Sequence, residues 1–471
     1  MCRRWIGLGH WVRSLWVLSV LAASVPVLFA TEAPKADGLM DLGNKAAQSR
    51  QRGHSLNIWD LQSFDSKIFI GMGSTVRNTG PVPIWAYDHA MQKWGDGPEA
   101  VIDQEAIELF RVLDGVLYIP AADPKGEIGD RSKFYRRDPD GSWTHFVSSR
   151  TFLTAHIRDL VIHEDWVIGV GNSRRPHNLT RARTGSVALP LLAVQNTRGG
   201  VQELPLYRSA ITLEPWAESG ALVDEVTSQR NRAANWFFSV FYLHDGLYAS
   251  TRWLSWGSEE PGRAVGRAHR PELTVFPPLV RWNSAIEQWV APASGELHRL
   301  VPLSPERDTG LTLWPFKPVL FGELWFAPLR GYSLHRANYG DYYNQSADFV
   351  VKPADGPGRR VTLPDSDALG EAVLIHDDKL FVLANAPQPN GGYRIAIYSL
   401  EAKAARAAHL SEETGMALDV WREVLHFRHA NLARSFARIE DTWYFGLGFA
   451  TGDPPGAAGT LLRYNKSQRD Q

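Results

Sequence analysis

The sequence feature that most constrains the fold is a repeated pair of short apolar segments joined by a tight polar turn. The first segment of each copy ends at Asp or Gly, and the second carries a central aromatic residue and ends in small residues. Such pairs predict antiparallel hairpins, because turn-forming residues separate two apolar runs of strand length. Seven copies occur, with turns near Asp65, Asp114, Asp165, Asp245, Gly322, Asp378 and Asp441.

Each hairpin is followed by a third apolar segment, such as "VPIWAYD" (82–88), and several copies add a fourth segment that carries tryptophan, such as "SWTHFV" (142–147). Four short strands per unit, repeated about every 40 to 60 residues, are the signature of β-propeller blades. We therefore predict an all-β fold, a β-propeller of seven four-stranded blades. Six or eight blades, a β-sandwich, or two smaller β domains are the alternatives.

The chain divides into three predicted regions. Residues 1–33 read as a signal peptide, with a basic start, the apolar run "LWVLSVLAASVPVLFA", and small residues before cleavage at Ala30 or Ala33. An uncleaved anchor is the alternative. Residues 34–53 are an N-terminal segment, helical or contributing to ring closure, and residues 54–471 form one propeller domain. This organisation predicts a secreted or periplasmic protein of a bacterial envelope, without a stable membrane span after cleavage.

Composition argues against several classes of function. The only cysteine, Cys2, lies in the predicted signal, so disulfides, thiol catalysis and cysteine-metal sites are not expected. The formal net charge of −1 shows no basic bias, so nucleic acid is not an expected partner. No cofactor is predicted, because phosphate-loop, dinucleotide and zinc motifs are missing from the sequence. No metal is predicted either, since His177, His269 and His335 have no ligand spacing.

The candidate site lies where propeller loops converge, at those that lead into innermost strands and those that join second and third strands. These second-to-third-strand connections are long and rich in Arg, His, Tyr and Trp in units 3, 4 and 5. In "TFLTAHIRDL", which begins the innermost strand of unit 3, period-two alternation puts His156 and Arg158 on one face. The candidate catalytic residues are His156, Arg158, Arg252 and Tyr339. The candidate substrate-binding residues are Asn235, Trp253, Trp256, Arg330, Tyr332, His335, Tyr342 and Tyr343.

Each candidate also has a purely structural interpretation. His156 also fits a core histidine that bonds to a neighbouring blade. Arg158 also fits an ion pair with the adjacent Asp159. The tryptophans and tyrosines of the long connections also fit loop packing.

The seven hairpins and the His-, Arg- and Tyr-rich loops of units 3 to 5 resemble secreted seven-bladed propellers that act on polysaccharides. The similar families are ulvan-type polysaccharide lyases and related propeller rhamnosidases, and the resemblance covers architecture and residue type, without a shared motif. It implies a lyase that cleaves a uronic-acid-containing anionic polysaccharide or oligosaccharide by β-elimination. That reaction needs a base, an acid, and a cation or donor on the carboxylate. The implied roles are His156 as base or acid, Arg252 or Arg158 on the carboxylate, and Tyr339, Tyr342 or Tyr343 as proton donor.

Two other classes of function stay open. A glycoside hydrolase on the same scaffold would need paired carboxylates, for which Asp159 and Asp341 are the candidates. A non-catalytic propeller that binds glycan or protein is the second, because a fold does not fix a function.

Overall fold

The computed structural model describes a little over half of the chain, all of it within the compact unit Pro34–Gln471. The predicted signal peptide, residues 1–33, lies outside the described residues. The described ranges are 38–45, 56–74, 80–121, 133–147, 154–163, 166–175, 187–196, 201–203, 237–243, 246–251, 279–283, 288–290, 311–333, 345–353, 358–361, 363–365, 367–404, 421–449 and 456–465.

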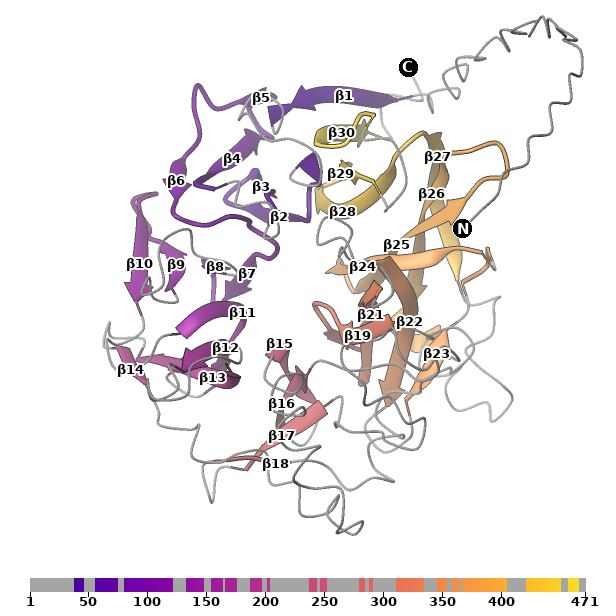
Figure 1. The fold of residues 1–471 in the computed structure, drawn as a ribbon. Helices are drawn as coiled ribbons and strands as arrows, with labels where there is room; N and C mark the ends of the chain where they lie inside the picture. Colours follow the sequence, from indigo (N-terminus) through magenta and orange to yellow (C-terminus); the bar gives the residue numbers. More distant parts are fainter. Residues whose placement is uncertain are drawn as a thin grey trace, which may run out of the picture. The chain divides into compact units, whose positions relative to one another are not determined.

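The described strands form seven sheets, numbered here in chain order (Figure 1). Sheet 1 contains β2 (Asp60–Phe64), β3 (Lys67–Gly71), β4 (Val82–Asp88), β5 (Lys93–Trp94) and β6 (Ala100–Ile102). Sheet 2 contains β7 (Arg111–Leu113), β8 (Val116–Pro120), β9 (Lys133–Arg137) and β10 (Trp143–Val147). Sheet 3 contains β11 (Thr154–His163), β12 (Trp166–Arg175), β13 (Val187–Asn196) and β14 (Val201–Glu203).

The remaining sheets repeat this antiparallel order. Sheet 4 contains β15 (Phe237–Leu243), β16 (Gly246–Thr251), β17 (Leu279–Asn283) and β18 (Gln288–Val290). Sheet 5 contains β19 (Leu311–Pro315), β20 (Val319–Phe321), β21 (Leu324–Ser333), β22 (Gln345–Pro353) and β23 (Arg359–Val361). Sheet 6 contains β24 (Leu369–His376), β25 (Lys379–Pro387), β26 (Tyr393–Glu401) and β27 (Arg422–His429). Sheet 7 contains β28 (Leu432–Ile439), β29 (Thr442–Gly448), β30 (Thr460–Asn465) and β1 (Leu39–Asn44).

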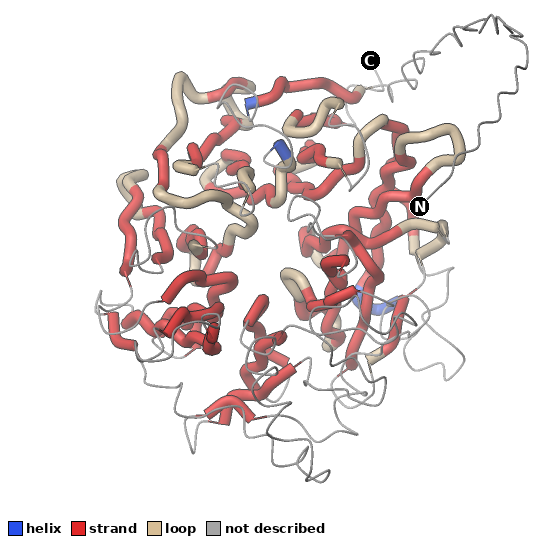
Figure 2. The backbone as a smooth tube through the Cα atoms, viewed as in Figure 1, coloured by secondary structure: helices blue, strands red, loops and turns tan. Residues whose placement is uncertain are grey.

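Successive sheets contact each other through their inner strands, and β2 of sheet 1 contacts β28 of sheet 7. β1, from the N-terminal segment, pairs antiparallel with β30 and gives sheet 7 its fourth strand. Strands dominate the described residues, and helix is confined to short pieces (Figure 2). The all-β class and the propeller arrangement are therefore confirmed. The blade count of seven for the whole chain stays a prediction.

The predicted hairpins are confirmed where their turns are described. Asp114 and Gly115, between β7 and β8, both have positive φ (47° and 73°). The two residues of the corresponding turns after β2, β20 and β24 also have positive φ. Two central residues with φ above zero define the type I′ turn, whose twist matches that of the strands it joins. The same local turn geometry therefore occurs in sheets 1, 2, 5 and 6.

Large aromatic side chains fill the spaces between neighbouring sheets. Phe381 of sheet 6 packs edge-on against Trp443 of sheet 7, with ring centroids 5.0 Å apart. Phe241 of sheet 4 and Trp325 of sheet 5 approach to 4.9 Å. Burial of each such ring contributes about 1.5 to 3 kcal/mol, so these contacts hold one sheet on the next.

Candidate functional site

Four innermost strands contain the same backbone irregularity. In β11, β15, β24 and β28, one extra residue at a shared position interrupts the pairing with the second strand of the sheet, and β11 has a second irregularity at Ala155. In each strand that residue lies five positions before the last strand residue. The extra residues are Arg158, Phe238, Glu371 and Arg434. Such β-bulges redirect a side chain out of the regular alternation and are frequent beside functional sites.

The same position can be located in the other three sheets by counting back from the end of the hairpin's first strand. In sheet 5 it falls at Phe316, where the inner strand is split into β19 and β20 before Pro318, which has no N–H to donate. In sheets 1 and 2 it falls at Trp59 and Glu108. We call the seven residues the inner-strand ring: Trp59, Glu108, Arg158, Phe238, Phe316, Glu371 and Arg434.

Members of the inner-strand ring on successive sheets bind one another. Arg158 Nη1 donates to Glu108 Oε2 at 3.0 Å, which joins sheets 3 and 2. Arg434 Nη1 donates to Glu371 Oε1 at 3.5 Å, which joins sheets 7 and 6. The guanidinium of Arg434 also lies over the ring of Trp59, 5.2 Å from its centroid. The ring therefore joins neighbouring sheets by ion pairs and a cation–π contact.

The two ion pairs of the ring differ in burial. The side chains of Arg434 and Glu371 are only 2% and 3% exposed, and Arg434 Nη2 also donates to the carbonyl oxygen of Phe449 at 2.8 Å. In the other pair, Arg158 is 8% and Glu108 19% exposed. The Arg434–Glu371 pair is therefore enclosed in the interior and has a structural role, whereas the Arg158–Glu108 pair is partly exposed to solvent.

Two aspartates that directly follow ring positions join further sheets. The Asp60 carboxylate accepts the backbone N–H of Phe110 in sheet 2 at 2.7 Å and also binds the ammonium of Lys317. Lys317 lies between β19 and β20 of sheet 5, and sheets 6 and 7 come between sheet 5 and sheet 1 in the order of contacts. The Asp60–Lys317 contact therefore links two sheets that are not neighbours.

The Asp159 carboxylate accepts more hydrogen bonds than the Asp60 carboxylate. Its two carboxylate oxygens accept from Arg111 Nε and Nη2 at 2.7 and 2.8 Å, from the N–H of Leu160 at 2.8 Å and from that of Val240 at 2.9 Å. Burial opposes the charge of Arg111, but the Asp159 and Asp60 carboxylates outweigh it and raise the Arg111 pKa above its ordinary value. A carboxylate that accepts four hydrogen bonds and is buried has little capacity left for a substrate.

The structure changes the interpretation of β11. The alternative interpretation of Arg158 as an ion-pair partner of Asp159 is wrong, because Arg158 pairs with Glu108 and Asp159 pairs with Arg111. Strict alternation along β11 is also wrong, since Ile157 and Leu160, three positions apart, pack in the same core cluster. The bulge between them accounts for this change of face.

The other predicted site residues stay untested. His156 lies in β11 opposite Asn172, and Arg330 and Tyr332 lie in β21 opposite Trp314 and Thr312. The remaining candidates lie outside the described residues: Asn235, Arg252, Trp253, Trp256, His335, Tyr339, Tyr342 and Tyr343.

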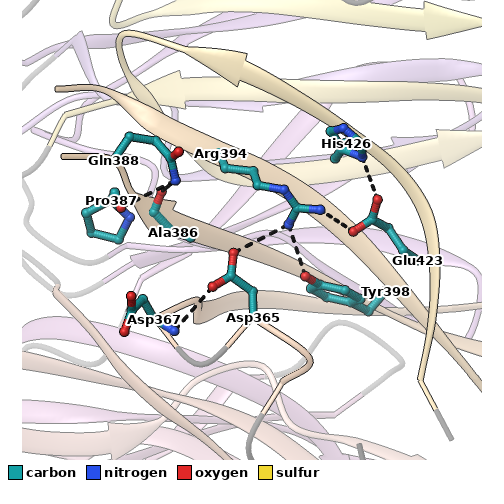
Figure 3. Close-up of polar contacts among 9 residues, drawn as sticks. All are labelled: Asp365, Asp367, Ala386, Pro387, Gln388, Arg394, Tyr398, Glu423 and His426. Carbon is teal, nitrogen blue, oxygen red and sulfur yellow. Dashed lines mark hydrogen bonds and ion pairs between the residues drawn. The ribbon is translucent and has the colours of Figure 1, made fainter. Parts of the chain in front are cut away.

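A polar cluster on one face of sheet 6 was not predicted from the sequence (Figure 3). Arg394 Nη1 approaches Asp365 Oδ2 at 3.5 Å and donates to the Tyr398 hydroxyl at 3.2 Å, and its Nη2 binds Glu423. Glu423 in turn binds the ring of His426. The signal was available in "YRIAIYSL", where Arg394 and Tyr398 alternate with buried isoleucines.

The charges in this cluster satisfy one another. Burial opposes the charge of Glu423, but Arg394 and His426 outweigh it and lower the Glu423 pKa. Burial also opposes the charge of Arg394, while bonds to Tyr398 and Glu423 raise the Arg394 pKa. The cluster therefore ties the segment before β24 to the two outer strands of sheet 6, and we assign it a structural role.

His429, at the end of β27, gives the protein an acid-sensitive position. Burial lowers its pKa, and its Nδ1 accepts the N–H of Asn431 at 2.9 Å. The unfolded chain therefore binds a proton that the folded chain does not, and stability is lost as pH falls from about 6.5 towards the depressed folded pKa. We expect His429→Gln to flatten the stability profile in this window, measured by urea unfolding across pH. The exposed His145→Gln variant is the control, and an equal slope in both variants would contradict the assignment.

Within the described residues, no helix is long and apolar enough to cross a membrane. In that same part of the chain, no group of three or more His, Cys, Asp or Glu side chains is placed to hold a metal ion.

No protein-family model matches the chain, and no curated protein matches it. Among solved structures, the Pyrococcus horikoshii acylaminoacyl peptidase is 11% identical, with a TM-score of 0.40, over 83% of this chain and 48% of its own. Sqt1 of Saccharomyces cerevisiae is 11% identical, with a TM-score of 0.38, over 92% of this chain and 99% of its own. The polysaccharide lyase Uly1 is 9% identical, with a TM-score of 0.39, over 92% of this chain and 99% of its own. The chain spans about half the length of the peptidase, and these similarities give no basis for transferring an activity to it.

Proposed function

We propose that the protein is a secreted polysaccharide lyase that cleaves a uronic-acid-containing anionic polysaccharide by β-elimination. The observation that supports the proposal is the position of Arg158. Arg158 is the extra residue of a bulge in an innermost strand, and its side chain, 8% exposed, pairs with Glu108, which is 19% exposed. A bulge beside a site serves to aim a side chain, and a guanidinium matches a carboxylate in shape and charge.

The strand ends support the same location. β12, β16 and β21 end at the edge of their sheets where the inner-strand ring lies, and the three long connections follow them. Thr251, the last residue of β16, pairs with Phe237, which directly precedes the ring residue Phe238. Arg252 follows Thr251 in sequence. Arg252 belongs to the connection after β16 and Tyr339 to the connection after β21. Most of the residues proposed to bind substrate belong to the same two connections: Trp253, Trp256, His335, Tyr342 and Tyr343.

The proposed reaction assigns one role to each group. A guanidinium, from Arg158 or Arg252, neutralises the substrate carboxylate and so acidifies the hydrogen on the adjacent carbon. A base removes this proton, the electron pair forms a carbon–carbon double bond, and the glycosidic carbon–oxygen bond breaks. An acid gives a proton to the leaving oxygen. His156 is proposed as base or acid and Tyr339 as proton donor, with Tyr342 and Tyr343 as its alternatives.

The test is to incubate the protein with a panel of uronic-acid-containing polysaccharides and, as controls, neutral polysaccharides. We expect the ultraviolet absorbance of unsaturated uronate to rise together with new reducing ends, and only on an anionic polymer. New reducing ends without that absorbance would mean hydrolysis, and binding without either would mean a non-catalytic role. A hydrolase that uses Asp159 gains no support, because that carboxylate already accepts four hydrogen bonds.

A further inference from the structure

The sheet ends opposite the inner-strand ring expose large apolar side chains. Among the described residues, eight large hydrophobic residues are exposed, and four of them lie on innermost strands. These four are Val112 (39% exposed), Tyr242 (41%), Leu320 (56%) and Ile375 (39%). Scattered exposed apolar residues need no explanation, but their concentration on one type of strand does.

The four residues occupy one structural position. Each is the last but one residue of its strand, directly before the two-residue connection, in β7, β15, β20 and β24. The same position in β11 holds Ile162, which is partly buried. The series therefore covers five successive sheets, from sheet 2 to sheet 6. We call it the apolar arc: Val112, Ile162, Tyr242, Leu320 and Ile375.

The arc lies over a packed interior. The residues that face Val112, Leu320 and Ile375 across the hairpins are Leu117, Trp325 and Leu380. All three are buried, at 1% exposure or less. The arc residues are thus the outermost layer of the apolar spaces between sheets, and a partner that covered them would extend an existing core.

The connections beside the arc are acidic. Every one of the seven two-residue connections contains Asp or Glu, and none contains Lys or Arg. Type I′ turns accept Asn and Gly as readily as Asp, and Glu is not a turn-forming residue. Turn geometry alone therefore does not require a carboxylate at every connection. Asp114, Glu323 and Asp378 are exposed next to the arc, and Asp377, which is also exposed, contacts His376 and Arg438.

We propose that the apolar arc binds a basic amphipathic polypeptide segment of a partner protein. Aliphatic or aromatic side chains of the segment would cover Leu320, Ile375 and their neighbours. Its Lys and Arg side chains would lie against the acidic connections, as charge complementarity requires. A second copy of the chain does not fit this face, because two acidic rims would meet. An anionic membrane surface is repelled for the same reason.

The experiment uses the full chain and a fluorescently labelled amphipathic helical peptide of Leu and Lys. A matched Leu and Glu peptide tests charge, and a Lys and Ser peptide tests the apolar contribution. We expect the Leu/Lys peptide to bind with an affinity that falls as salt is added, and the other two peptides to bind much more weakly. The readout is fluorescence anisotropy.

The variant pair is Leu320→Ser with Ile375→Ser, and the matched control is Val101→Ser, which is 60% exposed on β6 of sheet 1. We expect the double variant to weaken peptide binding by about tenfold or more, and Val101→Ser to leave it unchanged. Thermal unfolding checks that all variants fold. Equal binding by the double variant and the control, or equal binding of the Leu/Glu peptide, would overturn the proposal. Self-association of the chain that the double variant abolishes would also overturn it.

Discussion

Replacement of Arg434 by methionine is expected to lower the free energy of unfolding by about 3 to 5 kcal/mol. The substitution leaves the Glu371 carboxylate, 3% exposed, without its cationic partner. It also removes the hydrogen bond to the Phe449 carbonyl and the contact with the Trp59 ring. A charge left in the interior costs far more than the ion pair contributes when intact. Urea unfolding followed by tryptophan fluorescence measures the loss.

The double variant Arg434→Met with Glu371→Met is the control. Because it removes both charges, we expect it to recover part of the stability that the single variant loses. Lys379 and Glu401, whose side chains are 48% and 58% exposed, form a matched ion pair at the surface. Lys379→Met should lower the free energy of unfolding by about 1 kcal/mol or less. An effect of Arg434→Met as small as that of Lys379→Met would contradict the structural role of the ring.

If the protein is the proposed lyase, replacement of His156 by alanine is expected to lower the rate of elimination by about 100- to 10,000-fold, the usual contribution of a general acid or base. The effect should appear in kcat more than in KM, because proton transfer occurs only in the reaction step. The measurement is the initial rate at which the ultraviolet absorbance of unsaturated uronate rises, on whichever polymer the wild-type protein is found to cleave.

The control for this variant is His145→Ala, an exposed histidine on β10, which should retain full activity. Both variants should unfold at the temperature of the wild type, so that loss of activity is separated from loss of fold. If His156→Ala retains its activity on every anionic polymer tested, the catalytic assignment of His156 is wrong.

The propeller class could be predicted because its signal is local and repeated. Each hairpin carries its own apolar pattern and turn residues, as in "FRVLDGVLYIPAA", where Asp114 and Gly115 form the expected turn. The strand in the N-terminal region, β1, was harder to predict. It is short, and its partner β30 is far away in the sequence. Pairing between distant segments is not encoded in periodicity.

The inner-strand ring could not be predicted for the same physical reason. A β-bulge adds one residue without changing residue type, so "HIRDL" gives no sign that Arg158 leaves the alternation. The ion-pair partners could not be predicted either. Asp159 is adjacent to Arg158 in sequence but binds Arg111, 48 positions away. Only the strand register reveals the position, which lies five residues before the end of each of the four bulged strands.

The pairing of β1 with β30 has a consequence for the timing of folding. Leu39 lies opposite Tyr464, so β1 has no partner strand until β30, more than 400 residues later in the sequence, has joined sheet 7. Contacts between the two ends of a chain form slowly, since the loop that must close between them is long. The propeller therefore closes last, and two sheet edges stay unpaired until β1 pairs with β30. Such a protein exposes unpaired strand edges for longer during folding than one whose sheets are each completed in sequence order, which favours aggregation.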